Sequence, residues 1–262
     1  MLRALVKVVK SVAHREVMPR YLKVAHQHKS DGSLCTEADI AAQNALTSAL
    51  KQIADYPVLG EEMPSEMQKA CWQAGADGLW CVDPIDGTSN FVNGLPYFAL
   101  SVALMRQGRS VLAAIYDPVA DEAFYAEKGK GAYLNGERLP IKEYSPDLHR
   151  CMAGVDFKWL GDKLSAQLAS SPPYSSQRNY GASTLDWCYA AAGRFDVYLH
   201  GGQKLWDYAA GSLILEEAGG SMCTLEKNDF WADDVWKRSV IAALNPDLFQ
   251  AWKLWVRAAN KL

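Results

Sequence analysis

The chain contains 262 residues with 49% apolar side chains and a formal net charge of −3, enough to bury one large core or two packed lobes. This mild acidity, without any basic block, argues against a dedicated nucleic-acid surface. No stretch approaches the roughly 18 apolar residues of a membrane span, so we expect a cytoplasmic protein that does not enter a membrane. The six cysteines form no CxxC pair, which predicts reduced thiols rather than a disulfide framework or a zinc site.

The N-terminal segment predicts an amphipathic opening helix, because leucine and valine recur at helical spacing from Leu2 to Val12. Pro19 ends or restarts that helix. Further along, Thr36 and Asp39 resemble the capping box of a helix that runs to Ile53. From the local pattern, Asp39 either caps this helix or turns into a cleft to orient a water molecule.

A short buried strand is predicted at residues 56–59, and a glycine and two acids follow it at residues 60–62. Since adjacent side chains of a strand point to opposite faces, only one of Glu61 and Glu62 can face a site at its end. The alternative is an exposed acidic turn that begins a helix over residues 63–72.

The stretch with the strongest chemical signal is the apolar strand that begins at residue 79 and ends in Asp83-Pro84-Ile85-Asp86-Gly87-Thr88. Proline stiffens the turn, so the two aspartates can converge, and converging buried carboxylates need a cation. The stretch has no lysine or arginine, which favours a divalent metal. The N–H groups at residues 87–89 suit an anion, and a metal beside an anion indicates phosphate chemistry. The alternative is a surface turn with a helix cap.

Residues 97–140 contain β-prone runs separated by turn signals, which predicts an antiparallel meander. The chain then becomes polar around residues 141–150. We place a boundary there, between an N-terminal α+β lobe, residues 1–145, and a C-terminal α/β lobe, residues 146–262.

The second lobe is predicted to contain strands at residues 151–155 and 195–199 and helices at 160–169 and up to about residue 193. A further helix is predicted over residues 204–217. Asp207 in its first turn either favours the helix dipole or binds a metal. Tryptophans in the tail are expected in the core or an interface; they are Trp231, Trp236, Trp252 and Trp255.

Three segments in order, residues 60–62, 80–91 and 206–220, resemble the signatures of the inositol monophosphatase family of magnesium-dependent, lithium-sensitive phosphatases. The hexapeptide at residues 83–88 is the most specific of these matches. The likeness covers nearly the whole chain, including residues 36–39.

This resemblance implies a five-layer αβαβα sandwich of the sugar-phosphatase type, combining α+β and α/β lobes, and a homodimer. It implies that roughly two or three Mg²⁺ ions are held by carboxylates and one carbonyl. These metal ligands are Glu61, Asp83, the main-chain carbonyl of Ile85, Asp86 and Asp207. The implied catalytic residues are Asp39, Thr88 and Glu61. The implied substrate-binding residues are Ile85, Asp86, Gly87, Thr88, Gly181, Ala182, Ser183, His200 and Asp207.

The implied activity is hydrolysis of a small phosphorylated metabolite, with inositol 1-phosphate as the first candidate, by attack of an activated water. Substrate choice is open because His200 stands where the family often has an acid that accepts hydrogen bonds from substrate hydroxyls. His200 can instead meet a second phosphate or a carboxylate. Histidinol phosphate, fructose 1,6-bisphosphate and 3'-phosphoadenosine 5'-phosphate are the alternative substrates. A regulatory binding protein on the same fold is a further alternative, against which the complete set of metal ligands argues.

Overall fold

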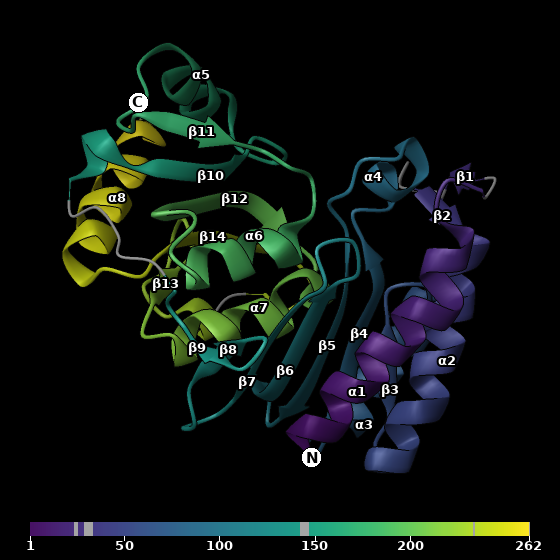
Figure 1. Cartoon of the computed structure of the whole chain (residues 1–262). Helices are drawn as coiled ribbons and strands as arrows, with labels where there is room; N and C mark the ends of the chain where they lie inside the picture. Colours follow the sequence, from purple (N-terminus) through teal and green to yellow (C-terminus); the bar gives the residue numbers. More distant parts are fainter. Residues whose placement is uncertain (24–25, 29–33, 142–146, 233, 262) are drawn as a thin grey trace.

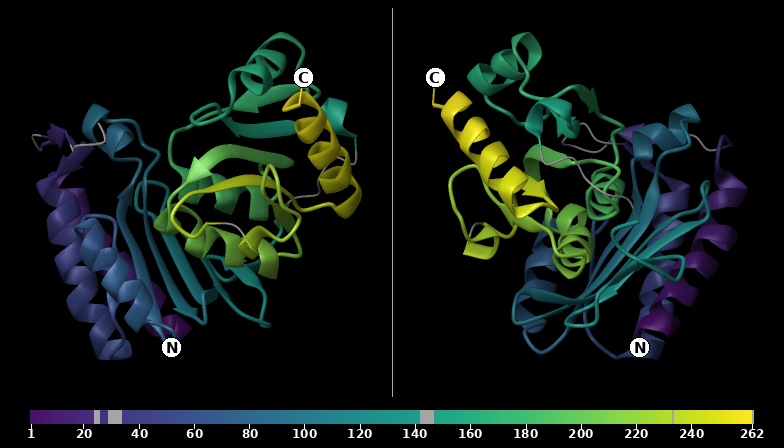
Figure 2. Two further views of the ribbon diagram at one scale, coloured as in Figure 1. Left: turned by 180° about the vertical axis from the view of Figure 1, so that it is seen from behind. Right: turned by 60° about the vertical axis from the view of Figure 1, so that its left-hand side comes forward.

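Helices and β-sheets alternate in layers through the molecule (Figure 1). The computed structural model describes residues 1–23, 26–28, 34–141, 147–232 and 234–261. Three pairs of helices form the outer, middle and outer layers: α1 (Leu2–Val12) with α2 (Glu37–Ile53), α6 (Ser183–Ala191) with α7 (Leu205–Glu217), and α5 (Asp162–Ser170) with α8 (Pro246–Ala259). Figure 2 shows the two outer pairs on opposite sides of the molecule. The predicted five-layer αβαβα sandwich is confirmed.

The larger sheet has seven strands in the order β3-β4-β5-β6-β7-β8-β9. Their bounds are Val58–Gly60, Leu79–Asp86, Ala99–Arg106, Arg109–Asp117, Glu122–Glu127, Ala132–Leu134 and Glu137–Arg138. β3 and β4 are parallel, and every later neighbouring pair is antiparallel, which confirms the predicted meander. Both faces are apolar because helices cover both. Along β5, for example, Leu100 and Val102 pack toward α1 and α2, whereas Ala99 and Ala103 pack toward α6 and α7.

The smaller sheet has five strands in the order β11-β10-β12-β14-β13. Their bounds in chain order are Met152–Asp156 (β10), Ser176–Arg178 (β11), Val197–Gln203 (β12), Ser221–Cys223 (β13) and Arg238–Ala243 (β14). β10 is parallel to both β11 and β12, whereas β14 is antiparallel to its two neighbours. The short polar edge strand β11 was not predicted, because Ser-Gln-Arg shows neither a β-branched residue nor alternation of apolar and polar side chains.

The N-terminal helix and the shorter elements complete the fold. The predicted opening helix is present as α1, which ends at Val12 and continues into a π-helical turn, Ala13–Val17, and a 3₁₀ turn, Met18–Arg20, which contains Pro19. The remaining elements are β1 (His26–His28), β2 (Leu34–Thr36), α3 (Ser65–Ala74), α4 (Thr88–Asn93) and the 3₁₀ turns Leu148–Arg150 and Phe230–Ala232. The predicted division between lobes at residue 145 falls in 142–146, outside the described residues, and stays a prediction. No helix in the described ranges combines the length and apolarity that crossing a membrane requires.

The middle helices α6 and α7 pack unusually closely, and a glycine permits it. A Cβ atom added at Gly211 of α7 would lie 2.4 Å from Cβ of Trp187 of α6, well inside van der Waals contact. Trp187 is fully buried and donates from Nε1 to Oε1 of Gln203 at 3.0 Å, so its ring has no room to retreat. This contact sets the separation of the two helices that carry Thr184 and Asp207.

Gly211→Ala should lower the free energy of unfolding by up to about 2 kcal/mol. An alanine in a helix ordinarily gains about 1 kcal/mol over glycine, but overpacking a rigid core costs roughly 1–3 kcal/mol. Urea unfolding measures the difference. The matched control is Gly161→Ala, because the nearest atom to a Cβ there is 3.9 Å away. A gain in stability from Gly211→Ala would show that the two helices can separate freely.

Candidate active site

A β-bulge at the end of β4 aims two aspartates at one place. Asp83 pairs with Ser101 and Asp86 with Ala99, so two residues of β4, Pro84 and Ile85, stand opposite a single residue of β5. In a regular strand, residues three apart point to opposite faces, and the extra residue of the bulge re-aims Asp86. Proline fits there because it has no N–H to donate to the ladder. The expected convergence of the two carboxylates therefore rests on a bulge.

Acids from three other elements join this pair. Burial raises the pKa of Asp83 well above its ordinary value, and the charges of Glu61, Asp86, Asp207 and Asp39 raise it further. Burial likewise raises the pKa of Asp207, with the charges of Asp86 and Glu61 adding to the effect. Glu61 follows β3, Asp39 lies in the first turn of α2 and Asp207 lies in that of α7. The fold thus gathers the acids that are separated in the sequence.

The donor chemistry of this cluster fits Mg²⁺. Its side chains are oxygen donors without histidine or cysteine ligands, and buried acids of raised pKa are groups whose charge a divalent cation would offset. Across the described ranges, however, no three His, Cys, Asp or Glu side chains stand close enough to form a metal-binding group. The charges of these acids act on one another. To bind one ion jointly, their side chains would have to come closer to each other than they are here.

Thr184, which sequence reasoning missed, holds Asp86. Its N–H and its hydroxyl donate to Oδ2 of Asp86 at 2.6 and 2.7 Å. Burial raises the pKa of Asp86 to about 6, and the donors of Thr184 oppose that rise. The only sequence signal was a hydroxyl residue in the first turn of α6, which is also an ordinary helix-start preference.

Asp39 caps α2 with one carboxylate oxygen and contacts Thr88 with the other. Oδ2 of Asp39 accepts from the N–H and hydroxyl of Thr36 at 2.7 and 2.6 Å, which completes the capping box. Oδ1 of Asp39 lies 3.5 Å from Oγ1 of Thr88, and the same hydroxyl donates to the carbonyl of Ile85 at 3.0 Å. Because a carboxylate has two oxygens, capping and a cleft-facing role are compatible.

Gly87, just after β4 of the larger sheet, contacts the loop before α6 of the middle helix layer. Gly87 has φ +87°, and a Cβ there would lie 3.1 Å from Cβ of Ala182 and 3.0 Å from the carbonyl oxygen of Tyr97. Asn90 of α4, also missed by the sequence argument, donates to the carbonyls of Tyr97 and Tyr180, each at 2.7 Å. These contacts place the predicted segment Gly181, Ala182 and Ser183 beside the end of β4.

His200 lies inside the smaller sheet and is neutral near pH 7. Its Nδ1 accepts from the N–H of Gly202 at 3.0 Å, so the ring proton is on Nε2. Nε2 is 3.7 Å from Oδ2 of Asp156. Burial lowers the pKa of His200 to about 4; Asp156 opposes this shift and Lys158 adds to it. A neutral imidazole offers no charge to a second phosphate, which weakens that sequence-based hypothesis.

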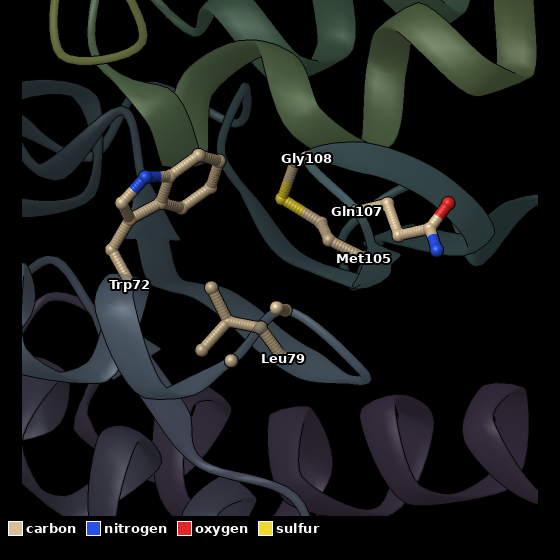
Figure 3. A pocket seen from close by; sticks show the side chains of 7 residues that line it. Trp72, Leu79, Met105, Gln107 and Gly108 are labelled. Carbon is tan, nitrogen blue, oxygen red and sulfur yellow. The ribbon is translucent and has the colours of Figure 1, made fainter.

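A small cavity of about 150 Å³ is separate from these acids (Figure 3). It lies at the start of β4, beside Leu79, whereas the aspartates stand at the end of the strand. Asp83 lies four residues and Asp86 seven residues beyond Leu79, which is roughly 13 and 23 Å along an extended strand. Most of its lining is apolar, from Trp72, Gly75, Ala76, Leu79, Met105, Gln107 and Gly108, and it contributes nothing to the acidic site.

The sequence model of the inositol monophosphatase family matches residues 1–257. The chain belongs to this family. Among its members, the Inositol-1-monophosphatase of Caulobacter vibrioides is 34% identical over 229 residues, 84% of this chain and 86% of that protein. The Nus factor SuhB of Pseudomonas aeruginosa is 39% identical over 193 residues, 71% of this chain and 70% of that protein.

Solved structures of the family share the fold. A Thermotoga maritima IMPase superposes with a TM-score of 0.83 and 28% identity, covering 98% of this chain and 96% of that one. The extragenic suppressor protein suhB from Bartonella henselae gives a TM-score of 0.82 and 28% identity, covering 99% and 97%. The fold and family are thereby shown, and both kinds of named relative resemble the chain to a similar degree.

Thr184→Val should weaken the site without unfolding the protein. Removing the hydroxyl donor leaves Asp86 held by the backbone N–H groups of Thr184 and Gly87, and loss of such a support typically costs about 10- to 100-fold in metal affinity or activity. Mg²⁺ titration of the purified protein, followed by calorimetry, measures the change. Thr47→Val on α2, whose hydroxyl bonds only within its own helix, is the matched control. Equal Mg²⁺ affinity in both variants would contradict the role of Thr184.

The contribution of His200 to stability should fall as the pH drops from about 6.5 toward 4. The unfolded chain binds a proton on this residue at the ordinary pKa of 6.5, whereas the folded chain binds it only near pH 4, so this group favours unfolding in acid. The carboxylates of raised pKa act in the opposite direction, but equally in the parent chain and in a His200 variant. The change in stability from pH 7.5 to 5 should therefore be more favourable by roughly 2 kcal/mol in His200→Asn than in the parent chain. The asparagine Oδ1 can still accept from Gly202. Urea unfolding at both pH values tests this, and identical changes would contradict it.

Proposed function

We propose that the chain is a Mg²⁺-dependent phosphomonoesterase acting on a small phosphorylated metabolite, with inositol 1-phosphate as the first candidate. The observation that supports it most is the gathering of Asp83, Asp86, Glu61, Asp207 and Asp39 in one buried place. Such a cluster costs stability unless cations offset it. Membership of the inositol monophosphatase family supports a sugar-phosphatase class of reaction.

The proposed Mg²⁺ ligands are Glu61, Asp83, the Ile85 carbonyl, Asp86 and Asp207. When bound, Mg²⁺ supplies positive charge that offsets these carboxylates and the phosphoryl oxygens. Thr184 fixes one oxygen of Asp86, and the bulge fixes Asp83 through the Ile85 N–H, which donates to its Oδ1 at 3.1 Å. These supports orient the ligands from within the protein.

Asp39 and Thr88 are proposed to orient and deprotonate the attacking water. The Thr88 hydroxyl donates its proton to the Ile85 carbonyl, so the lone pairs of Oγ1 can accept a hydrogen bond from a water molecule. Asp39 Oδ1 is 3.5 Å away, close enough for one water to contact both groups. The Thr36 donors fix the other oxygen of Asp39, which keeps the carboxylate pointed at that water. Glu61 is proposed to act with them.

The proposed substrate wall comes from both lobes. Gly87 and Thr88 on one side face Gly181, Ala182 and Ser183 on the other, and His200 and Asp207 complete the predicted set. The family relation supports a phosphorylated metabolite; histidinol phosphate, fructose 1,6-bisphosphate and 3'-phosphoadenosine 5'-phosphate remain candidate alternatives. The homodimer and the cytoplasmic location stay predictions.

A binding role is the second candidate, because relatives named Nus factor SuhB are as similar to the chain as those named Inositol-1-monophosphatase. The retained acids favour catalysis, since a purely structural role gives no reason to bury a set of like charges. The two roles are separable by measurement, because only catalysis depends on these acids and on Mg²⁺.

Phosphate release by the purified chain tests the proposal. Inositol 1-phosphate and the alternative substrates should be hydrolysed only with Mg²⁺, and Asp83→Asn should lower the rate at least about 100-fold by removing a metal ligand. Asp55→Asn, the same change at an exposed position, should leave the rate within about twofold. Absence of turnover by the folded parent chain on every substrate would overturn the phosphatase proposal and favour the binding role.

A further inference from the structure

Asp156 lies at the carboxyl end of a parallel strand of the smaller sheet. It is the last residue of β10 and stands opposite His200 of the parallel neighbour β12. Ligands of such sheets bind outside the carboxyl ends of parallel strands. From the same end, β12 leads through Lys204 directly into α7 and Asp207. Asp156 and the acidic site therefore lie at one edge of the smaller sheet.

The surrounding backbone fixes the Asp156 carboxylate without neutralising it. Oδ1 accepts from the Lys158 N–H at 2.7 Å, and Oδ2 lies 3.7 Å from Nε2 of His200, beyond a good hydrogen bond. The side chain is 17% exposed. Its lone pairs outnumber these two neighbours, so it can still accept donors from outside the protein.

A glycine holds the loop after Asp156 against β12. A Cβ at Gly201 would lie 2.3 Å from the carbonyl carbon of Trp159 and 2.4 Å from the backbone nitrogen of Leu160. This close backbone contact makes the turn that follows β10 rigid, and the carboxylate with it. A rigid acceptor is the kind of group that discriminates between ligands.

The charge of Asp156 acts on a residue of the predicted metal site, Asp86. It raises the pKa of Asp86, in the same direction as burial does, and Lys158 lowers the pKa of Asp207. The segment that carries Asp156 and Lys158 is thus electrostatically part of the site, although none of its residues belongs to the set carried over from the family resemblance.

We propose that Asp156 accepts hydrogen bonds from hydroxyl groups on the alcohol part of the substrate and so selects a polyhydroxylated phosphate ester. This proposal rests on the proposed phosphatase function and names the substrate class. His200 stands opposite Asp156 on the neighbouring strand, with Nε2 3.7 Å from the same carboxylate, and acts as a positioning residue by packing beside it. A carboxylate accepts from hydroxyls more strongly than neutral groups do, so its loss affects polyol substrates selectively.

Kinetics on two substrates test the proposal. Asp156→Asn should lower kcat/KM for inositol 1-phosphate roughly 10- to 100-fold, mainly through KM, because a charged hydrogen bond to the substrate is lost. Its kcat/KM for p-nitrophenyl phosphate, which has no hydroxyl, should stay within about twofold, and this also shows that the variant is folded. Asp156→Ser, whose hydroxyl can still accept from Lys158, provides a second variant. Asp162→Asn, exposed in the same lobe, is the matched control.

The outcomes separate the two proposals. Equal losses on both substrates, or no loss on either, would overturn the role of Asp156 and leave the phosphatase proposal intact. If the parent chain hydrolyses neither ester with Mg²⁺, both proposals are overturned. A selective loss on inositol 1-phosphate supports both.

Discussion

Mutual repulsion among buried carboxylates is the constraint on which the rest of this structure depends. Asp83, Asp86 and Asp207 each have a pKa raised by burial, and they face one another's charge. Folding must hold these groups together against that repulsion. The apolar layers on both sides of the larger sheet supply the burial, and hydrogen bonds from Thr184, Thr36 and the backbone fix the oxygens in place.

The cluster also explains where the larger sheet meets the middle helix layer. Asp86 belongs to the larger sheet, but its main partner, Thr184, begins a helix of the middle layer. At the same place Gly87 approaches Ala182, and Asn90 bonds the carbonyl of Tyr180. On the far side of the middle layer, Glu217 accepts from the N–H groups of the turn between β7 and β8. The site is therefore built at a junction that hydrogen bonds secure at two separated points.

The groups proposed for the reaction and those proposed for substrate choice lie in different layers. The bulge, Thr88 and Asp39 belong to the layer of α2 and the larger sheet, whereas Asp156, His200 and the Gly201 contact belong to the smaller sheet. Under the proposed function, a substitution in one group therefore need not disturb the other.

The sequence by itself determined the local features. Turn residues between β-prone runs predicted the meander, and helical spacing predicted the N-terminal helix α1. The hexapeptide at residues 83–88 with its companions predicted the family and fold. These signals work because they depend on neighbours within a few residues.

Only the tertiary structure decided the partners of the acids. Thr184 is far from Asp86 in the chain, and Asp156 meets His200 through strand pairing, so no spacing in the sequence reports either contact. The bulge too depends on the register of β5 against β4. Asp39 shows the physical reason in one residue. Its cap follows from residues three apart, whereas its second oxygen meets Thr88 only because the packing of α2 brings it there.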